Sequence, residues 1–259
     1  MSGALSFVGA GPGDPELLTR AGRERLVRAD VVVVDRESLD ELIEHHAPGT
    51  PRVLVGRSAD GPAWSLDRIV DLLVDLVASG RRVVRLKSGD LFVCARTAEE
   101  TRELAARGVE HETVAGVSAA VAAPAAAGIP VTRRDCTTAF TVIAGNDDAT
   151  YPNIGWDAVA AAGGTIVVLM GRAHQRAIAS RLQAAGLAPS TPVAVVHAGT
   201  RPTQQVRRGR LDELGDLRLP APATVVIGAV AALDLTPIVE LEAVDPDLDT
   251  AVGGVRAHP

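Results

Sequence analysis

Short apolar runs rich in β-branched residues alternate along the chain with stretches in which apolar residues recur at helical spacing. In the first half, the runs that predict strands are 5–8, 31–34, 52–55, 82–86 and 110–114. Helical spacing within 17–28 and 65–77 predicts helices between these strands. Ser65 as an N-cap and Gly80 as a stop signal give the second helix the range 66–79. The alternation predicts a parallel sheet with helices on its faces.

The same pattern restarts after the segment Gly128-Ile129-Pro130. The second half has predicted strands at 139–144, 165–170, 192–196 and 224–227, and predicted helices at 156–162 and 174–185. We therefore expect the α/β class, with two α/β domains that span residues 1–131 and 132–243. The tail, 244–259, is rich in Asp, Gly and Pro, and we expect it to be disordered.

Composition narrows the functional classes. With 259 residues, a formal charge of −6 and 2% aromatic residues, the chain lacks the basic surface of a nucleic-acid-binding protein and the aromatic belts of a membrane protein. The uncharged stretch 113–132 contains Pro124 and Pro130, which favour a buried helix and a loop over a membrane span. Cys94 and Cys136 form no Cys-x-x-Cys pair, and no leader-like segment precedes the first strand, so we expect a cytoplasmic protein.

The clearest candidate for ligand contact is the loop after the first strand, Gly9-Ala10-Gly11-Pro12-Gly13-Asp14-Pro15. Glycine lets the backbone approach a ligand closely or adopt a positive φ. A dinucleotide-binding fingerprint is one alternative, but it begins its helix at the third glycine, and Pro12 and Pro15 oppose that geometry. A plain strand-to-helix turn is another alternative, although it needs fewer glycines and prolines than this loop contains.

Two more loops follow predicted strands, Ser88-Gly89-Asp90-Leu91-Phe92 and Ala115-Gly116-Val117-Ser118-Ala119-Ala120. In an open parallel sheet such strand ends form the ligand crevice, where Asp90 would accept hydrogen bonds from ribose hydroxyls or an amino group. The alternative for Asp90 is an Asx turn. Ser118 has the setting of a hydrolase nucleophile, but the closing glycine of that motif is missing, so we expect a helix N-cap there.

These loops, in their order and spacing, resemble the tetrapyrrole methylases, the class III S-adenosylmethionine (SAM) methyltransferases. The resemblance runs from about residue 5 to residue 233. The segments that carry it are 8–14, 17–19, 29–36, 80–87, 127–132, 170–171 and 192–196. It implies two α/β domains with SAM in the cleft between them, and a homodimer.

The resemblance also implies a function and a set of site residues. The implied reaction is methyl transfer from SAM to carbon atoms of an anionic tetrapyrrole, with uroporphyrinogen III as the expected acceptor and precorrin-2 as the product. The residues that match the family's SAM contacts are Pro12, Ser88, Gly89, Asp90, Val93, Ser118, Ala119, Met170 and Gly199. The residues that match its catalytic positions are Asp35, Arg57 and Arg96.

The chemistry of the reaction is consistent with these residue types. An electron-rich pyrrole carbon attacks the methyl sulfonium in line, and the ring must then lose a proton. Asp35, at a predicted strand end, is the expected base. Arg57 stands where the family has a lysine, and it can hold an anion but cannot act as a general acid because a guanidinium does not deprotonate in a protein.

Several substrate-side positions depart from the family pattern. The resemblance therefore leaves the identity of the acceptor more open than the identity of the cofactor. The departures are Val34, Leu91, Asn146, Leu169 and His197. The expected acceptor, uroporphyrinogen III, carries a carboxylate on each of its side chains, so its pocket needs cations. The candidate cations are Arg57, Arg85, Lys87, Arg96 and Arg133 or Arg134, and the alternative for them is a solvated surface.

Three alternatives to the expected function remain. A diverged family member would methylate another precorrin or a small molecule of a specialised pathway. A nicotinamide-dependent dehydrogenase would use an acidic residue at a second strand end, which Asp35 permits. A non-catalytic SAM-binding protein is the third. We expect no metal site, because His45 and His46 are adjacent and point to different sides of a helix.

Overall fold

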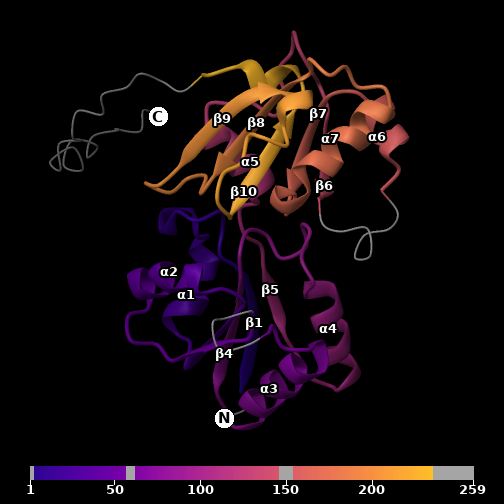
Figure 1. Ribbon diagram of the computed structural model, residues 1–259. Coiled ribbons are helices and arrows are strands. Elements are labelled where there is room, and N and C mark those ends of the chain that lie inside the picture. Colours follow the sequence, from indigo (N-terminus) through magenta and orange to yellow (C-terminus); the bar gives the residue numbers. More distant parts are fainter. Residues whose placement is uncertain (1–2, 57–61, 146–153, 236–259) are drawn as a thin grey trace, which may run out of the picture.

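The computed structural model describes residues 3–56, 62–145 and 154–235. The chain forms two lobes, each built on a five-stranded sheet, and they stack end to end (Figure 1). Within the described ranges, no helix is long and apolar enough to cross a membrane. Arg57, Asn146 and the tail 244–259, about which the sequence makes predictions, lie outside the described residues.

The first sheet is parallel throughout and has the strand order β3-β2-β4-β1-β5. Its strands are β1 (Ala4–Gly9), β2 (Val31–Val34), β3 (Arg52–Leu54), β4 (Arg82–Lys87) and β5 (Glu112–Val114). The parallel sheet predicted from the apolar runs is therefore confirmed. In register, Gly9 of β1 pairs with Lys87 of β4, so these two strands end together.

Helices cover both faces of this sheet (Figure 1). Their bounds are α1 (Arg20–Val27), α2 (Asp40–His46), α3 (Leu66–Ala78) and α4 (Thr97–Ala106). Helices α1 and α2 pack on one face, and α3 and α4 pack on the other. Ser65 caps α3 by accepting a hydrogen bond from Arg68 N, as predicted. The helix predicted at 17–28 begins later than expected, because a 3₁₀ helix at Pro15–Leu17 precedes α1.

The second sheet is mixed and has the order β6-β7-β10-β8-β9. Its strands are β6 (Phe140–Ala144), β7 (Thr165–Leu169), β8 (Pro192–His197), β9 (Gln205–Arg210) and β10 (Ala223–Ile227), and its helices are α5 (Ala119–Ala126), α6 (Trp156–Ala161) and α7 (Gln175–Ala184). Only β6 and β7 run parallel, and the other pairs are antiparallel. Strand β9 was not predicted, because its sequence is mostly polar and basic.

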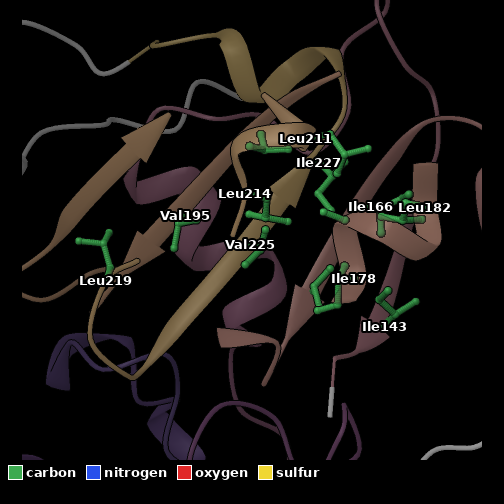
Figure 2. Packing of buried hydrophobic residues seen from close by; sticks show 13 residues of the cluster. Ile143, Ile166, Ile178, Leu182, Val195, Leu211, Leu214, Leu219, Val225 and Ile227 are labelled. Atoms are coloured by element: carbon green, nitrogen blue, oxygen red, sulfur yellow. The ribbon is translucent and has the colours of Figure 1, made fainter. Parts of the chain in front are cut away.

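Alternate residues of the second sheet face different helices. Ile178 and Leu182 of α7 pack with Ile143 and Ile166 in the cluster of Figure 2. Residues on the other face of the same sheet, such as Val196 of β8, pack against α5. Helix α5 thus belongs to the core of the second lobe although it precedes residue 131. The domain boundary after residue 131 stays a prediction.

Three backbone segments meet at the carboxyl edge of the first sheet. Gly9 ends β1, Gly89 follows β4 and Gly116 follows β5. A Cβ atom at Gly116 would lie 2.2 Å from the carbonyl oxygen of Gly89 and 2.7 Å from the carbonyl carbon of Gly9. A Cβ atom at Gly9 would lie 2.5 Å from the amide nitrogen of Gly116. Only residues without a side chain permit this approach.

We expect Gly116→Ala to lower the free energy of unfolding by about 3 kcal/mol, because backbone atoms rather than flexible side-chain tips would have to move. The matched control is Gly49→Ala, since Gly49 has φ +74° and nothing within 4 Å of its Cβ position. That substitution should cost only about 1 kcal/mol, from the left-handed backbone. Urea denaturation measures both values, and equal destabilisation by the two substitutions would contradict the close approach.

Candidate active site

The loops that follow β1, β4 and β5 are joined to one another by hydrogen bonds. Gly89 N donates to Gly11 O at 2.8 Å, and Gly11 N donates to Gly89 O at 3.2 Å. The loop after β5 is tied in by the Asp90 carboxylate, whose Oδ2 accepts from Gly116 N at 3.2 Å. No helix begins within the Gly9–Gly13 segment, so the dinucleotide-binding fingerprint is absent from this loop.

Asp90 has backbone partners on both carboxylate oxygens. Its Oδ1 accepts from Phe92 N at 2.9 Å, so the Asx turn that the sequence offered as an alternative is present. Each carboxylate oxygen has two acceptor sites, so the side chain keeps capacity for another donor. Asp90 is partly exposed, and this capacity is accessible to a ligand.

No atom crowds the Cβ position of Gly89, although the residue itself is buried. Gly89 has φ +70°, and the nearest atom to a Cβ built there is Ala119 N at 3.9 Å. Ser118 caps α5 through a hydrogen bond from Ala120 N to its hydroxyl, so the N-cap predicted for Ser118 is confirmed. The first turn of α5 therefore stands beside Gly89, with Ala119 N nearest to it. The next three amides of α5 are already bonded to Ser118, so Ala119 N is the group of this turn that can favour a polar or anionic ligand.

Loops of the second lobe face this edge, and their backbones are strained. Among the described residues, the non-glycine residues with positive φ are Cys94, Met170, Ala198 and Thr200. Met170, Ala198 and Thr200 follow β7 and β8 of the second lobe, whereas Cys94 follows β4 of the first. Such strain concentrates at functional sites. Gly199 packs against α5, since a Cβ there would lie 2.5 Å from Ala123 Cβ.

The loop after β8 also bonds to the first lobe. Thr200 Oγ1 accepts from Asp14 N at 3.1 Å, and Arg201 Nη2 donates to Ser38 O at 3.0 Å. These bonds bring the segment around Gly199 next to the segment around Pro12. Residues predicted as ligand contacts from both ends of the chain are thus brought together.

A buried ionic cluster lies at the carboxyl ends of β2 and β4. Arg85 donates to Asp35 Oδ1 at 2.5 Å and to Glu100 Oε2 at 2.8 Å. Lys87 Nζ donates to Glu100 Oε1 at 2.5 Å and lies 3.6 Å from Asp35 Oδ2. Two positive and two negative charges are therefore paired, which burial away from water requires.

This cluster corrects one interpretation of the sequence. Arg85 and Lys87 were candidate cations for substrate carboxylates, but both are buried and bound to Asp35 and Glu100, so that assignment is wrong. Sequence reasoning also missed Glu100. One signal in the sequence could have indicated it. Arg85 and Lys87 stand at alternate positions of a buried strand, and buried charges of one sign require a counter-charge nearby.

The charges of the cluster set the acidity of Asp35. Burial raises the pKa of its carboxyl group, but the positive charges of Arg85 and Lys87 and their hydrogen bonds outweigh burial and hold the pKa below its usual value. Asp35 is the most exposed member of the cluster, with 33% of its side chain accessible. It therefore presents an ionised carboxylate at the edge of the site.

The remaining predicted residues lie on the loops around these groups. Arg96 is exposed at the N-terminal end of α4, Ser88 is exposed and Val93 is partly exposed in the loop after β4, and Met170 is 37% exposed. Arg133 is exposed and paired with Asp135. Within the described ranges, no three His, Cys, Asp or Glu side chains gather as a metal site.

Together these features define an α/β protein of two lobes, with its candidate site where glycine loops of one sheet face strained loops of the other. The sequence profile of the Tetrapyrrole (Corrin/Porphyrin) Methylases matches residues 4–215. The chain belongs to this family.

Two curated relatives illustrate the similarity. A protein of Methanosarcina barkeri named S-adenosyl-L-methionine-dependent uroporphyrinogen III methyltransferase is 40% identical over 237 residues, which cover 89% of this chain and 93% of that protein. Siroheme synthase of Neisseria meningitidis serogroup B is 41% identical over 233 residues, which cover 89% of this chain. The chain spans only 48% of the length of that synthase.

Solved structures agree with the fold. Uroporphyrin-III C-methyl transferase of Thermus thermophilus, in complex with S-adenosyl homocysteine, has a TM-score of 0.74 and 33% identity, and the match covers 88% of this chain and 98% of that one. A cobalt precorrin-4 methyltransferase has a TM-score of 0.77 and 28% identity, with 90% and 96% covered. The α/β fold expected from the sequence is confirmed.

Asp35 makes the stability of the protein depend on pH. Its pKa in the folded protein lies below the ordinary value of about 3.9, so its stabilisation is fully present above that pH and is lost as the pH falls through the folded-state pKa. We expect the difference in unfolding free energy between wild type and Asp35→Asn, measured with urea, to be widest near neutral pH and to narrow in acid. A difference that stays constant with pH would contradict the charged pairing.

Proposed function

We propose that the protein transfers methyl groups from SAM to carbon atoms of uroporphyrinogen III, which leads to precorrin-2. The observation that carries this proposal is the match to the Methanosarcina barkeri uroporphyrinogen III methyltransferase, because it covers nearly the whole of both chains. The siroheme synthases share only part of their length with this chain, and they support the same class of reaction.

The residues at the candidate site fit SAM. Asp90 has acceptor capacity for ribose hydroxyls, and the missing side chain at Gly89 lets a ligand approach the backbone there. Ala119 N, at the start of α5, offers an amide donor beside it. We propose that the full set of SAM contacts is Pro12, Ser88, Gly89, Asp90, Val93, Ser118, Ala119, Met170 and Gly199.

Bound SAM would supply an electrophilic methyl group. We propose that Asp35 accepts the proton that the ring carbon releases after it has gained the methyl. The cluster keeps Asp35 ionised at neutral pH, so it is ready to accept a proton without first losing one. Arg96 would hold a carboxylate of the acceptor at the exposed end of α4. Arg57, outside the described residues, is proposed to bind an anion in place of the family's lysine.

Three further expectations accompany this function as proposals. The domains divide at residues 131 and 132, the protein acts as a homodimer, and it works in the cytoplasm on an anionic tetrapyrrole without a nucleic-acid or membrane partner.

The diverged-acceptor alternative stays open, since the departures from the family pattern concentrate on the substrate side. Two of them, Val34 and Leu169, end strands that point at the candidate site.

Asp90 provides the test of the cofactor. Calorimetry of wild type should give a micromolar or tighter Kd for S-adenosylhomocysteine, about −8 kcal/mol, without competition from NAD. Asp90→Ala should weaken this binding by about 1.5–3 kcal/mol, because hydrogen bonds to a charged group are lost. The control Asp75→Ala, on the exposed side of α3, should bind as wild type does. Binding of NAD but not of S-adenosylhomocysteine would end the proposal.

Asp35 and uroporphyrinogen III provide the test of the reaction. Anaerobic incubation of wild type with SAM and enzymatically made uroporphyrinogen III should yield methylated product, detected by mass and absorbance. Asp35→Asn should keep its affinity for S-adenosylhomocysteine and lose about 100-fold or more in turnover, the usual share of a general base. Unchanged turnover would remove Asp35 as the base. Wild type that binds SAM but leaves uroporphyrinogen III unmethylated would point to another acceptor.

A further inference from the structure

The buried ionic cluster contains a carboxylate that the proposed reaction does not use. Glu100 lies on α4 with only 3% of its side chain accessible, and it faces the strand that carries Arg85 and Lys87. Both of its oxygens are occupied, by Arg85 Nε at 2.8 Å, Arg85 Nη2 at 3.1 Å and Lys87 Nζ at 2.5 Å. Burial keeps Glu100 from reaching a substrate, so any effect of Glu100 on chemistry must act through its two cations.

The same two cations hold Asp35. Arg85 donates with Nη2 to Asp35 Oδ1 and to Glu100 Oε1, so one nitrogen bridges the two carboxylates. A third bond, from Arg85 Nη1 to Val33 O at 3.3 Å, fixes the guanidinium against β2. The orientation of Asp35 thus depends on a group whose other side is held by Glu100.

We infer that Glu100 is a positioning residue for Asp35: it holds the shared cations Arg85 and Lys87 in place against Asp35 and offsets part of their charge, so that the Asp35 carboxylate stays a stronger base than two unopposed cations would leave it. This inference rests on the proposed function, in which Asp35 accepts the proton. Within the described residues, the charged groups that face Asp35 are Arg85 and Lys87 from β4, with Glu100 behind them on α4.

Stability alone does not account for the arrangement. Removing four charges from water costs most of what their attraction returns, so a buried ion network adds little net stability compared with apolar side chains of similar size. The network has a larger effect on the basicity of Asp35, its most exposed member, than on stability. Without Glu100, two positive charges would act on Asp35 alone and make it a weaker base, whereas Glu100 offsets part of that charge.

Glu100 could act on Asp35 through its charge, which we call charge control, or only by holding α4 in place. The two roles predict different changes in the pKa of Asp35. The side-chain carboxyl ¹³C signal of Asp35 in the labelled full-length protein, assigned by its absence in Asp35→Asn, reports its pKa directly. Under charge control, Glu100→Gln lowers the pKa of Asp35, because a negative charge is lost, and Lys87→Met raises it, because a positive charge is lost. If Glu100 only braces α4, the pKa of Asp35 moves in the same direction in both variants or does not move, and the inference fails.

A second pair of variants covers the case in which Glu100→Gln does not fold. Lys87→Met/Glu100→Gln keeps one positive and one negative charge, and compared with Lys87→Met alone it must lower the pKa of Asp35. The matched control is Glu103→Gln on the same helix, whose partner is the exposed Arg102, and it should leave the Asp35 signal unchanged. An unchanged pKa between the two Lys87→Met proteins would overturn the inference.

Activity separates the inference from the proposed function. The acid limb of kcat with uroporphyrinogen III should move with the Asp35 signal, down in Glu100→Gln and up in Lys87→Met, while the KM for SAM stays near that of wild type. Suppose that wild type is inactive but the pKa of Asp35 falls in Glu100→Gln and rises in Lys87→Met. The proposed function would then be refuted, and the effect of the Glu100 charge on Asp35 would stand. Active wild type without those shifts would refute the inference alone.

Discussion

Contact between the backbones of Gly9, Gly89 and Gly116 sets the shape of the candidate site. Three parallel strands end at one edge, and the segments after them approach more closely than any side chain would allow. This approach lets Asp90 bond to Gly116 N and sets Gly89 beside the start of α5. Since α5 packs on the second sheet, the same edge links the cores of the two lobes.

A second constraint comes from charge. Strand β4 carries Arg85 and Lys87 into the interior, so the fold must bring carboxylates to them, and it does so with Asp35 from β2 and Glu100 from α4. Pairing makes Asp35 a reliably ionised group and at the same time a weaker base. The proposed proton transfer therefore depends on the charges that surround Asp35 in the cluster. The exposure of Asp35 does not by itself set its basicity.

Local patterns predicted much of this structure. The apolar run 31–34 became β2, Ser65 and Ser118 became N-caps, and the prolines of the glycine loop kept a helix from starting there. Strand β9 was missed because its basic sequence follows no apolar alternation. Glu100 was missed because charge pairing across α4 and β4 is a tertiary contact, which a pattern along one chain segment does not contain. The site residues stay predictions until a ligand is seen on them.

We propose that the edge of the first sheet where Gly9, Gly89 and Gly116 meet, with Asp90 beside it, holds the cofactor. The most direct measurement is a crystal structure of the protein with S-adenosylhomocysteine. We expect the product to lie against Gly89 and the first turn of α5, with a ribose hydroxyl on the Asp90 carboxylate. A product bound away from Asp90, at any other edge of either sheet, would contradict it.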